Sequence, residues 1–573
     1  MRKTPSALDL LEMLNPADRE IVEQETVPLH LPAGRDLFRE GDTGDALYLV
    51  MSGSLGVYMQ SSTNEHRLIS LVGPGETVGE MALISGQPRS ATVTAIRDTE
   101  LLRLAKSRFD RLMKLKPEIM SGMMRILVHR LRRISDGAGV MIEPKTVALL
   151  PAHDGPDARA VASRLADQLT AEGSSVKLVG PDGHHESARW FNELEQSHDH
   201  VFLYGTAEDT AWSRLCARQA DRILIVADVQ WNSDTSLPDD LLKERARHQL
   251  LDLILLHREG HSRSADIHRQ IAVVPANRHF HMRFDCDRDW SRLARIVGGR
   301  GVGLVLSGGG ARAFAHIGVI RAFADAGIPI DFVGGTSMGA IIGAGVAMEW
   351  SPDELAERVF ASFVSSNPLS DITLPLLGMV KGKKVERLLE EHFGDWAIPD
   401  LWRPFFCISS NLTSGTVYVH QHGPVRDALR ASIALPGILP PKVDAQSVLV
   451  DGAVTSNLPV DVMRNIHRGP IVAVDVARDR AVGPELLTDY HAEPWYRRFL
   501  RPPIVSILMR AATVSGEEQD RRQAANADLF MAPALGDIEI RDWNAFDRAI
   551  EIGYEHAAAA LAGFKPGSLR RKG

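Results

Sequence analysis

The leading candidate for a catalytic residue, judged by residue type and spacing, is a serine between two glycines. Ser337 lies between Gly335 and Gly339, after an apolar segment at 331–333 and before a Gly- and Ala-rich segment that predicts a helix. In a nucleophile elbow, a strained strand-to-helix turn exposes such a serine, and the two glycines leave room for the neighbouring chains. The motif alone leaves an ordinary turn open as the alternative.

A run of glycines precedes this serine in a similar context. The loop from Ser307 to Arg312 reads Ser-Gly-Gly-Gly-Ala-Arg, and it joins the apolar segment 302–306 to a helical pattern at 313–326. Consecutive glycines leave backbone N–H groups unshielded at a helix N-terminus, where the helix dipole also favours negative charge. Such a loop could hold a phosphate or a developing oxyanion, with a tight turn as the structural alternative. Because both motifs join a strand to a helix, together they favour a serine hydrolase.

A serine hydroxyl needs a base that accepts its proton. In α/β-hydrolases the base is a histidine that follows the serine in the chain. No downstream histidine lies in a strand-end loop with turn glycines, and these histidines include His420, His422, His467 and His491. Asp451 does lie in such a loop, since it ends the apolar segment 447–450 and precedes Gly452. Strand ends in α/β sheets carry functional groups, although an aspartate that caps a turn is the alternative.

In this order, the three motifs resemble those of the patatin-like phospholipases. The resemblance extends from about residue 300 to about residue 480 and takes in Arg430-Ala-Ser432, Leu435-Pro-Gly437 and Asn457-Leu-Pro459. It implies a Ser–Asp dyad, with Ser337 as the nucleophile and Asp451 as the base.

The same resemblance assigns the oxyanion hole to the glycine loop. The implied residues are Gly308, Gly309 and Gly310, with Arg312 beside them. The sequence departs from the family pattern at Ala313, where glycine is usual. A methyl group at this position should leave the hole intact.

An aspartate can serve as the base only if its environment raises its basicity. Free Asp titrates near ~3.9, whereas burial without a cationic partner raises the pKa. We therefore expect a buried Asp451 to deprotonate Ser337 for attack on an ester carbonyl. It would then deprotonate the water that hydrolyses the acyl-serine.

Residues 29–104 read as short β-runs separated by glycine turns, which predicts a small barrel or jelly roll. Within it, Gly79, Glu80, Arg89 and Ser90 resemble the phosphate-binding cassette of cyclic-nucleotide-binding domains. The resemblance implies that Glu80 accepts from a ribose hydroxyl and that Arg89 binds the phosphate. Cyclic AMP or cyclic GMP is then the expected regulatory ligand. A surface Glu and Arg on a loop is the alternative, and many relatives of this fold bind no nucleotide.

The chain has 573 residues, too many for one hydrophobic core. We predict a barrel or jelly roll with flanking helices at 1–138, a Rossmann-like α/β connector at 145–290 and a patatin-like α/β hydrolase with a mainly parallel sheet at 300–573. This order is similar to the neuropathy target esterase family, which hydrolyses phospholipids and especially lysophospholipids. The connector has no phosphate-loop lysine and no complete G-x-G-x-x-G, so we assign no catalysis to it.

Composition sets limits on the partners. The net charge of −8 gives no general affinity for polyanions. The basic segment 103–133 continues into a linker rather than a recognition helix, so we predict no nucleic-acid partner. The three cysteines are widely spaced, which excludes a disulfide framework and suits a reducing cytoplasm. The pairs His279/His281 and His420/His422 lack nearby cysteines or paired carboxylates, so we predict no metal site.

The sequence predicts neither a signal peptide nor a membrane span. We expect a cytoplasmic protein, and peripheral contact with the inner face of the membrane stays open. Segments 374–380 and 495–501 place apolar residues beside Lys or Arg, as a lipid contact would, although buried segments with charged ends are the alternative. Homo-oligomerisation also stays open.

The leading hypothesis is a serine lipid hydrolase, a lysophospholipase or phospholipase with no catalytic cofactor, regulated through its barrel. The alternative is a cyclic-nucleotide sensor or scaffold with a weak or degenerate hydrolase domain.

Overall fold

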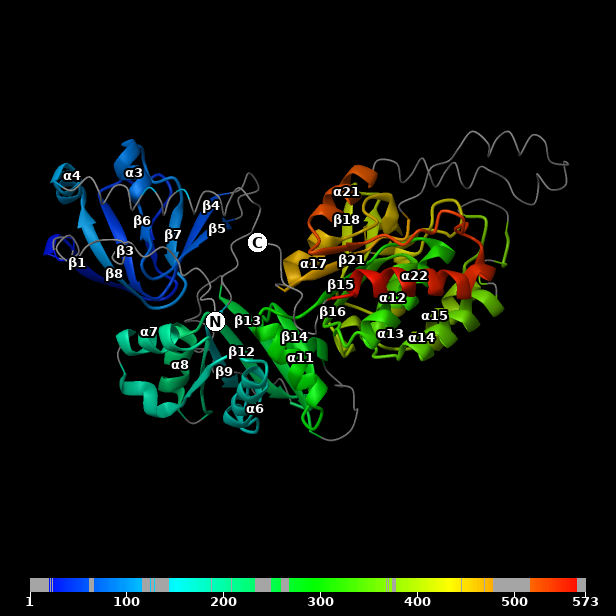
Figure 1. Cartoon of the computed structure of the whole chain (residues 1–573), viewed down its shortest axis with the longest axis horizontal. Coiled ribbons are helices and arrows are strands. Elements are labelled where there is room, and N and C mark those ends of the chain that lie inside the picture. Colours follow the sequence, from blue (N-terminus) through cyan, green and yellow to red (C-terminus); the bar gives the residue numbers. More distant parts are fainter. Residues whose placement is uncertain are drawn as a thin grey trace.

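The computed structural model describes residues 20, 22, 24–60, 66–115, 124, 128, 144–231, 249–258, 267–373, 378–477 and 516–563, except positions 187, 208, 367, 369, 445 and 468. They form three domains in series, with the connector between the barrel and the C-terminal domain (Figure 1). The C-terminal domain is called the catalytic domain below, after the prediction from the sequence. The expected linker at 135–139, residues 374–377 of the first lipid-contact segment, the whole segment 495–501 and His491 lie outside the described residues.

The N-terminal domain is a jelly roll of two antiparallel sheets, as the sequence predicts. The strand orders are β1-β8-β3-β6 and β2-β7-β4-β5. The strands are β1 (Val27–Leu31), β2 (Asp36–Phe38), β3 (Ala46–Ser52), β4 (Leu55–Gln60), β5 (His66–Val72), β6 (Thr77–Val78), β7 (Thr92–Ala95) and β8 (Thr99–Ala105), with helices α3 (Glu80–Ser85) and α4 (Lys106–Leu115). Burial alternates along β7, because successive side chains of a strand face opposite sides of the sheet.

The connector is a six-stranded sheet in the order β10-β11-β9-β12-β13-β14, and all its pairs are parallel. Its strands are β9 (Thr146–Pro151), β10 (Val176–Val179), β11 (His200–Tyr204), β12 (Arg222–Asp228), β13 (Leu250–His257) and β14 (Arg278–Arg283). Its helices are α6 (Ala158–Ala171), α7 (Ala188–Ser197), α8 (Thr210–Gln219), α10 (Ile267–Val273) and α11 (Asp287–Val297). Every residue of β9 is buried, which fits the apolar runs of a sheet covered on both faces.

The catalytic domain is built on a mainly parallel eight-stranded sheet in the order β19-β20-β17-β16-β15-β21-β22, with β18 paired to β17. The strands are β15 (Gly303–Leu306), β16 (Phe332–Thr336), β17 (Phe405–Asn411), β18 (Thr416–His420), β19 (Lys442–Asp444), β20 (Ser447–Asp451), β21 (Ile471–Val474) and β22 (Leu529–Met531). The α-helices are α12 (Ala315–Asp325), α13 (Met338–Ala347), α14 (Pro352–Val359), α15 (Lys383–Phe393), α16 (Val425–Ser432), α17 (Val460–Ile466), α21 (Glu517–Ala525) and α22 (Phe546–Leu561). Among the shorter helical segments are the 3₁₀ helix η2 (Gly310–Phe314) and the π-helix η3 (Phe360–Ser365).

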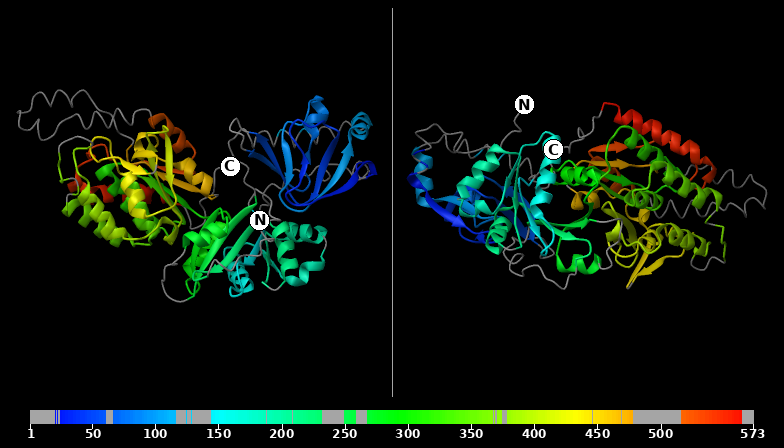
Figure 2. Two further views of the ribbon diagram at one scale, coloured as in Figure 1. Left: turned by 180° about the vertical axis from the view of Figure 1, so that it is seen from behind. Right: turned by 90° about the horizontal axis from the view of Figure 1, so that it is seen from below.

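The connector and the catalytic domain share a hydrophobic core. One apolar cluster joins Val147 and Trp290 of the connector to Phe332 and Phe406 of the catalytic sheet. Phe280 meets Phe332 edge to face, with ring centroids 6.3 Å apart. The two views of Figure 2 show the two sheets side by side along this contact.

The barrel contacts the connector through buried charges. Arg97, in the turn before β8, forms a two-pronged ion pair with Glu195 of α7, and its second nitrogen lies 2.8 Å from the second carboxylate oxygen. Both residues are buried.

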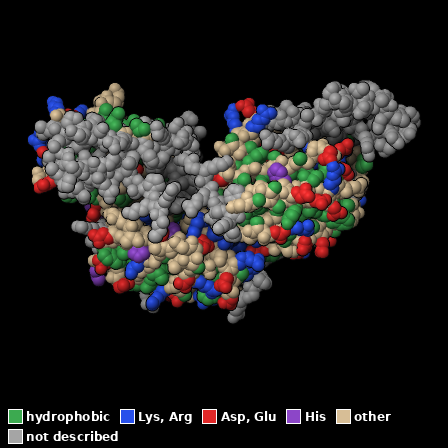
Figure 3. All heavy atoms as spheres, viewed as in Figure 1, with side chains coloured by type: hydrophobic (Ala, Val, Ile, Leu, Met, Phe, Trp, Pro, Cys, Tyr) green, Lys and Arg blue, Asp and Glu red, His purple; other side chains and the backbone are tan. Residues whose placement is uncertain are grey.

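The described face of Figure 3 carries acidic and basic side chains mixed over the connector and the catalytic domain. Among the described helices, none has both the length and the apolar composition to cross a bilayer.

Candidate active site

Ser337 lies in the sharp turn between β16 and α13. Its backbone has φ 54° and ψ −125°, a conformation that costs a non-glycine residue on the order of 1–3 kcal/mol. A Cβ on Gly335 would lie 2.6 Å from the carbonyl oxygen of Leu306, and a Cβ on Gly339 would lie 2.6 Å from the same oxygen. Both positions therefore need glycine, because β15 passes directly against the turn.

The hydroxyl of Ser337 donates to the carboxylate of Asp451. The distance from Oγ to Oδ2 is 2.6 Å, in the range of a charge-assisted O–H···O⁻ bond. Asp451 is fully buried, and Ser337 is 8% exposed. The Ala453 amide donates to Oδ1 of Asp451 at 2.9 Å, so the following turn holds one carboxylate oxygen while the other faces the serine.

The described histidines form no hydrogen bond with Ser337. His420 pairs with Ser409 at 2.8 Å, and burial lowers its pKa to about 4. His467 packs on Phe332 with ring centroids 4.4 Å apart, and burial lowers its pKa to about 3. His422 is exposed. The partner of the serine is thus a carboxylate, in the arrangement that the dyad hypothesis requires.

The glycine loop runs beside the serine. A Cβ on Gly308 would lie 2.8 Å from Cβ of Ser337. The Gly308 amide already donates a hydrogen bond to Oδ1 of Asn457 at 3.1 Å. Asn457 Nδ2 in turn donates to the Gly308 carbonyl at 3.1 Å. Within the described part of the chain, the amides of Gly309 and Gly310 donate no hydrogen bond. Of the three predicted glycines, these two are the ones whose amides could stabilise an oxyanion.

Arg312 contacts a loop far away in the sequence. Its Nε donates to the Ile538 carbonyl at 2.6 Å, and the Ala311 amide donates to the Ile540 carbonyl at 2.8 Å. Gly310, with φ 58°, has no room for a Cβ because Ile540 lies against it. These contacts make Arg312 an anchor of the loop, and its place beside an oxyanion stays a prediction.

His316 is a site neighbour that the sequence analysis missed. Its Nε2 hydrogen-bonds to the Ser307 carbonyl at 2.8 Å, and burial lowers its pKa to about 4. A neutral imidazole therefore supports the first residue of the glycine loop. A histidine in a helical, apolar stretch carries no sequence signal of this role.

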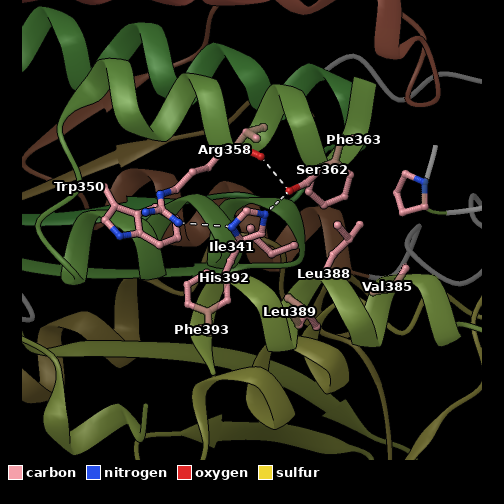
Figure 4. A pocket seen from close by; sticks show the side chains of 12 residues that line it. Ile341, Trp350, Arg358, Ser362, Phe363, Val385, Leu388, Leu389, His392 and Phe393 are labelled. Atoms are coloured by element: carbon pink, nitrogen blue, oxygen red, sulfur yellow. Dashed lines mark hydrogen bonds between the residues drawn. The ribbon is translucent and has the colours of Figure 1, made fainter. Parts of the chain in front are cut away.

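A cavity lies between helices of the catalytic domain (Figure 4). The empty space there amounts to about 420 Å³ with open solvent included, and it lies between α13, α14, η3 and α15. The apolar lining includes Ile341, Val359, Phe363, Val385, Leu388, Leu389 and Phe393. Ile341 is the lining residue nearest in sequence to Ser337, and helical side chains lean towards the preceding turn. The helix that begins at the elbow therefore contributes one wall residue to the cavity.

One end of the cavity holds polar groups of Arg358, Ser362 and His392 that form hydrogen bonds. His392 Nε2 lies 2.7 Å from Ser362 Oγ, and Ser362 Oγ donates to the Arg358 carbonyl at 2.7 Å. Arg358 also covers the ring of Trp350, 4.5 Å from its centroid. The other residues that line the cavity are aliphatic or aromatic.

In the barrel, the structure brings together three of the four residues predicted for the nucleotide. Gly79, with φ 89°, begins α3, and Glu80 is buried. Arg89 donates to the carbonyls of Gly79 and Ala46 at 2.8 Å each. Ser90 is exposed.

The described residues contain no cluster of three or more side chains able to hold a metal ion. His279 and His281 both hydrogen-bond through Nε2 to the Pro399 carbonyl, each at 2.8 Å. These two imidazoles join the connector to the catalytic domain.

Three family models match the chain in the order of its domains. Residues 28–116 match the cyclic nucleotide-binding domain, residues 143–297 the Neuropathy Target Esterase family P-loop like domain, and residues 304–464 the patatin-like phospholipases. These models confirm the predicted resemblance to the neuropathy target esterase family of patatin-like phospholipases. In this chain, the loop after β9 reads Ala152-His-Asp-Gly-Pro156, without a phosphate-binding lysine.

Two relatives match most of the length of this chain. Patatin-like phospholipase domain-containing protein 6 of Homo sapiens is 29% identical over 614 residues, which cover 94% of this chain and 45% of that protein. An uncharacterized NTE family protein of Mycobacterium tuberculosis is 29% identical over 553 residues, 93% of this chain and 91% of that protein. The chain therefore spans less than half the length of the first of these relatives.

Among solved structures, the N-terminal domain of a transcriptional regulator from Streptomyces coelicolor is 31% identical. The match covers 22% of this chain and 91% of the regulator's chain in that structure, with a TM-score of 0.20.

Proposed function

We propose that this chain hydrolyses the fatty-acyl esters of phospholipids, and of lysophospholipids in particular, with Ser337 as nucleophile and Asp451 as general base. The observation that carries the proposal is the 2.6 Å contact from Ser337 Oγ to Asp451 Oδ2, at a strained elbow beside two uncommitted glycine amides. This set supplies a nucleophile, a base and an oxyanion hole.

In the first half of the reaction, Ser337 Oγ attacks the ester carbonyl carbon as its proton passes to Asp451 Oδ2. The amides of Gly309 and Gly310 stabilise the tetrahedral oxyanion. When the intermediate collapses, the carbon–oxygen bond to the glycerol breaks, and the alcohol leaves with the proton from Asp451. In the second half, Asp451 takes a proton from water, the hydroxide attacks the acyl-serine, and the fatty acid departs as the proton returns to Ser337.

The apolar cavity supports a fatty-acyl substrate. Its lining includes Ile341, one helical turn after Ser337 in the sequence, and side chains of η3 and α15. A chain of methylene groups finds there a wall of aliphatic and aromatic side chains, and each buried methylene contributes about 0.8 kcal/mol. A single acyl chain on one side of the ester matches a lysophospholipid.

The test is fatty-acid release from lysophosphatidylcholine and from diacyl phosphatidylcholine. We expect release by the wild type, loss of release in Ser337→Ala, and wild-type release in Ser414→Ala, which removes an exposed serine of the same domain. Circular dichroism checks that the variants fold. Release retained by purified Ser337→Ala would refute the dyad. No release from wild type on either lipid would favour the sensor or scaffold hypothesis.

We propose cyclic AMP or cyclic GMP as the regulatory ligand of the barrel. In the structure the Arg89 guanidinium is occupied by the Gly79 and Ala46 carbonyls and stacks on Phe38, 4.1 Å from the ring centroid. Binding would require this guanidinium to exchange carbonyl oxygens for phosphate oxygens, which form stronger charge-assisted hydrogen bonds.

Isothermal titration with both nucleotides tests this ligand. We expect binding heat with the wild type and with Arg39→Ala, a variant at an exposed arginine of the same domain, and none with Arg89→Ala. Absence of heat from the wild type with either nucleotide would leave the barrel as a docking or dimerisation module.

A further inference from the structure

The two ends of helix α13 are the two places in the described chain where a non-glycine residue has a positive φ. Ser337 precedes the helix with φ 54°, and Glu349 follows it with φ 65°. The elbow explains the first strained residue. Nothing in the reaction described above explains the second.

Glutamate is a poor choice for this position on local grounds. The Glu349 amide donates to the Val346 carbonyl at 3.0 Å, and the Trp350 amide donates to the Gly345 carbonyl at 3.1 Å. This is the hydrogen-bond pattern of a Schellman motif, whose left-handed residue is usually glycine. A side chain disfavours the left-handed conformation, and a carboxylate at a helix C-terminus opposes the helix dipole. A favourable contact of the side chain must offset both costs.

That contact comes from the connector domain. Arg283 of β14 donates to Oε2 of Glu349 at 2.8 Å, and Arg292 of α11 donates to Oε1 at 3.2 Å. The Glu349 side chain is only 10% exposed. Both arginines also bind the fully buried Asp289, at 2.8 and 3.2 Å, so the connector holds them in place before they reach Glu349.

A third arginine caps the same helix end from within the catalytic domain. Arg403 donates to the Val346 carbonyl through its side chain at 2.9 Å and to the Ala347 carbonyl through its backbone at 3.2 Å. Its guanidinium lies 4.0 Å from the Glu349 carboxylate. The last turn of α13 is therefore fixed by three cations, two of which belong to the connector.

We propose that Glu349 is a positioning residue for the nucleophile, through which the connector fixes α13 and with it the elbow at Ser337. Every residue of α13 is buried, so the helix moves as a unit within its packing and a shift at one end reaches the other. Displacement of a reacting group by about 1 Å can lower the rate about 100-fold. The inference rests on the proposed function only in the role it gives to Ser337.

Steady-state kinetics of the full chain with a short, water-soluble ester tests this role. We expect Glu349→Gln and Glu349→Gly to lower kcat about tenfold or more and to leave KM unchanged, since the acyl cavity is intact. Glycine suits the left-handed backbone, so the second variant removes the contact while relieving the strain. The matched control is Asp353→Asn, which removes the exposed carboxylate paired with Arg321 and should keep wild-type kcat.

A double-mutant cycle separates positioning from general destabilisation. Arg283→Gln also removes the bond to Asp289, but its effect on kcat should pass through Glu349. The double variant should therefore lower kcat no further than Arg283→Gln alone. Wild-type kcat in both Glu349 variants, or independent effects of the two residues, would overturn the proposal.

Hydrogen exchange gives a readout that does not depend on hydrolysis. We expect the amides of residues 341–347 to exchange faster in Glu349→Gln than in wild type, because the last turn of the helix is released. If the wild type hydrolyses no ester, the proposed function is wrong, but hydrogen exchange still tests whether Glu349 fixes the helix. Unchanged exchange would overturn the positioning role.

Discussion

At the scale of single residues, the dyad is held by a hydroxyl that takes no part in the reaction. The Ser337 amide donates to Oγ of Ser432 at 3.0 Å, and Ser432 Oγ donates to the Ile408 carbonyl at 2.7 Å. Ser432 is fully buried. Its hydroxyl therefore ties the elbow to β17, the strand that pairs with the strand of Asp451.

Ser432→Ala should damage both stability and turnover. The substitution leaves the buried Ser337 amide without its acceptor, at a cost of about 1–3 kcal/mol. We expect a melting temperature several degrees lower and a reduced kcat, measured by calorimetry and by fatty-acid release. A variant with wild-type melting and turnover would show that the elbow holds its geometry without this contact.

The functional residues that lie in short sequence motifs could be predicted from the sequence. Ser337 and Asp451 each sit in a short motif between a strand and a turn, and the structure places them in contact. Ile540 and Glu349 could not be found in that way. Ile540 acts through its backbone carbonyl, and Glu349 is recognised only by arginines of another domain.

At the scale of elements, the strand that carries Asp451 is an antiparallel member of a mainly parallel sheet. The sequence argument placed the carboxylate at the end of a strand and left the direction of this strand open. In the structure, β20 is antiparallel to β17, with Asp451 opposite Ser409. β17 in turn pairs in parallel with β16, with Ile408 beside Thr336. The dyad forms because β17 extends past the end of β16 and brings β20 alongside it. Strand direction depends on partners far away in the sequence, so the pattern of one segment cannot predict it.

Helix α15 forms one wall of the apolar cavity, and its side chains should set the acyl length. Leu388 is half-buried on this helix and lines the cavity. We expect Leu388→Trp to fill part of the space without overpacking a closed core. Each methylene left outside costs about 0.8 kcal/mol, so exclusion of two lowers kcat/KM more than tenfold for a palmitoyl ester, whereas a butyryl ester keeps its rate.

The control for this change is Leu412→Trp, which adds the same side chain at an exposed position of the catalytic domain. Its profile across acyl lengths should match that of the wild type. Equal losses on short and long esters in Leu388→Trp would mean that the cavity does not receive the acyl chain.

At the scale of the whole molecule, the two domain contacts differ in kind. The barrel meets the connector at a buried ion pair, Arg97 with Glu195. The connector and the catalytic domain instead share an apolar core, and a chain of histidines lies at its edge. His257 Nε2 lies 2.9 Å from His281 Nδ1, and His281 Nε2 lies 2.8 Å from the Pro399 carbonyl. This chain satisfies its hydrogen bonds when His281 is neutral, donating from Nε2 and accepting at Nδ1.

Protonation of His281 should therefore weaken the contact between connector and catalytic domain. Burial lowers the pKa of His281 to about 3, and the neighbouring His279, His257 and Arg292 act in the same direction. The unfolded state, with a pKa near ~6.5, binds the proton first. The contribution to stability is thus complete above about pH 6.5 and is lost as the pH falls towards 3, by roughly 2 kcal/mol at pH 5.

His281→Gln isolates this one proton from those of the other buried histidines. A glutamine amide can donate to Pro399 and accept from His257, and it does not titrate. Calorimetry at pH 7 and pH 5 should show a smaller fall in the melting temperature of the connector and catalytic domain in this variant than in the wild type. His422→Gln, at an exposed histidine, should follow the wild type. If His281→Gln loses as much stability on acidification as the wild type, the proton that destabilises the domain contact binds elsewhere.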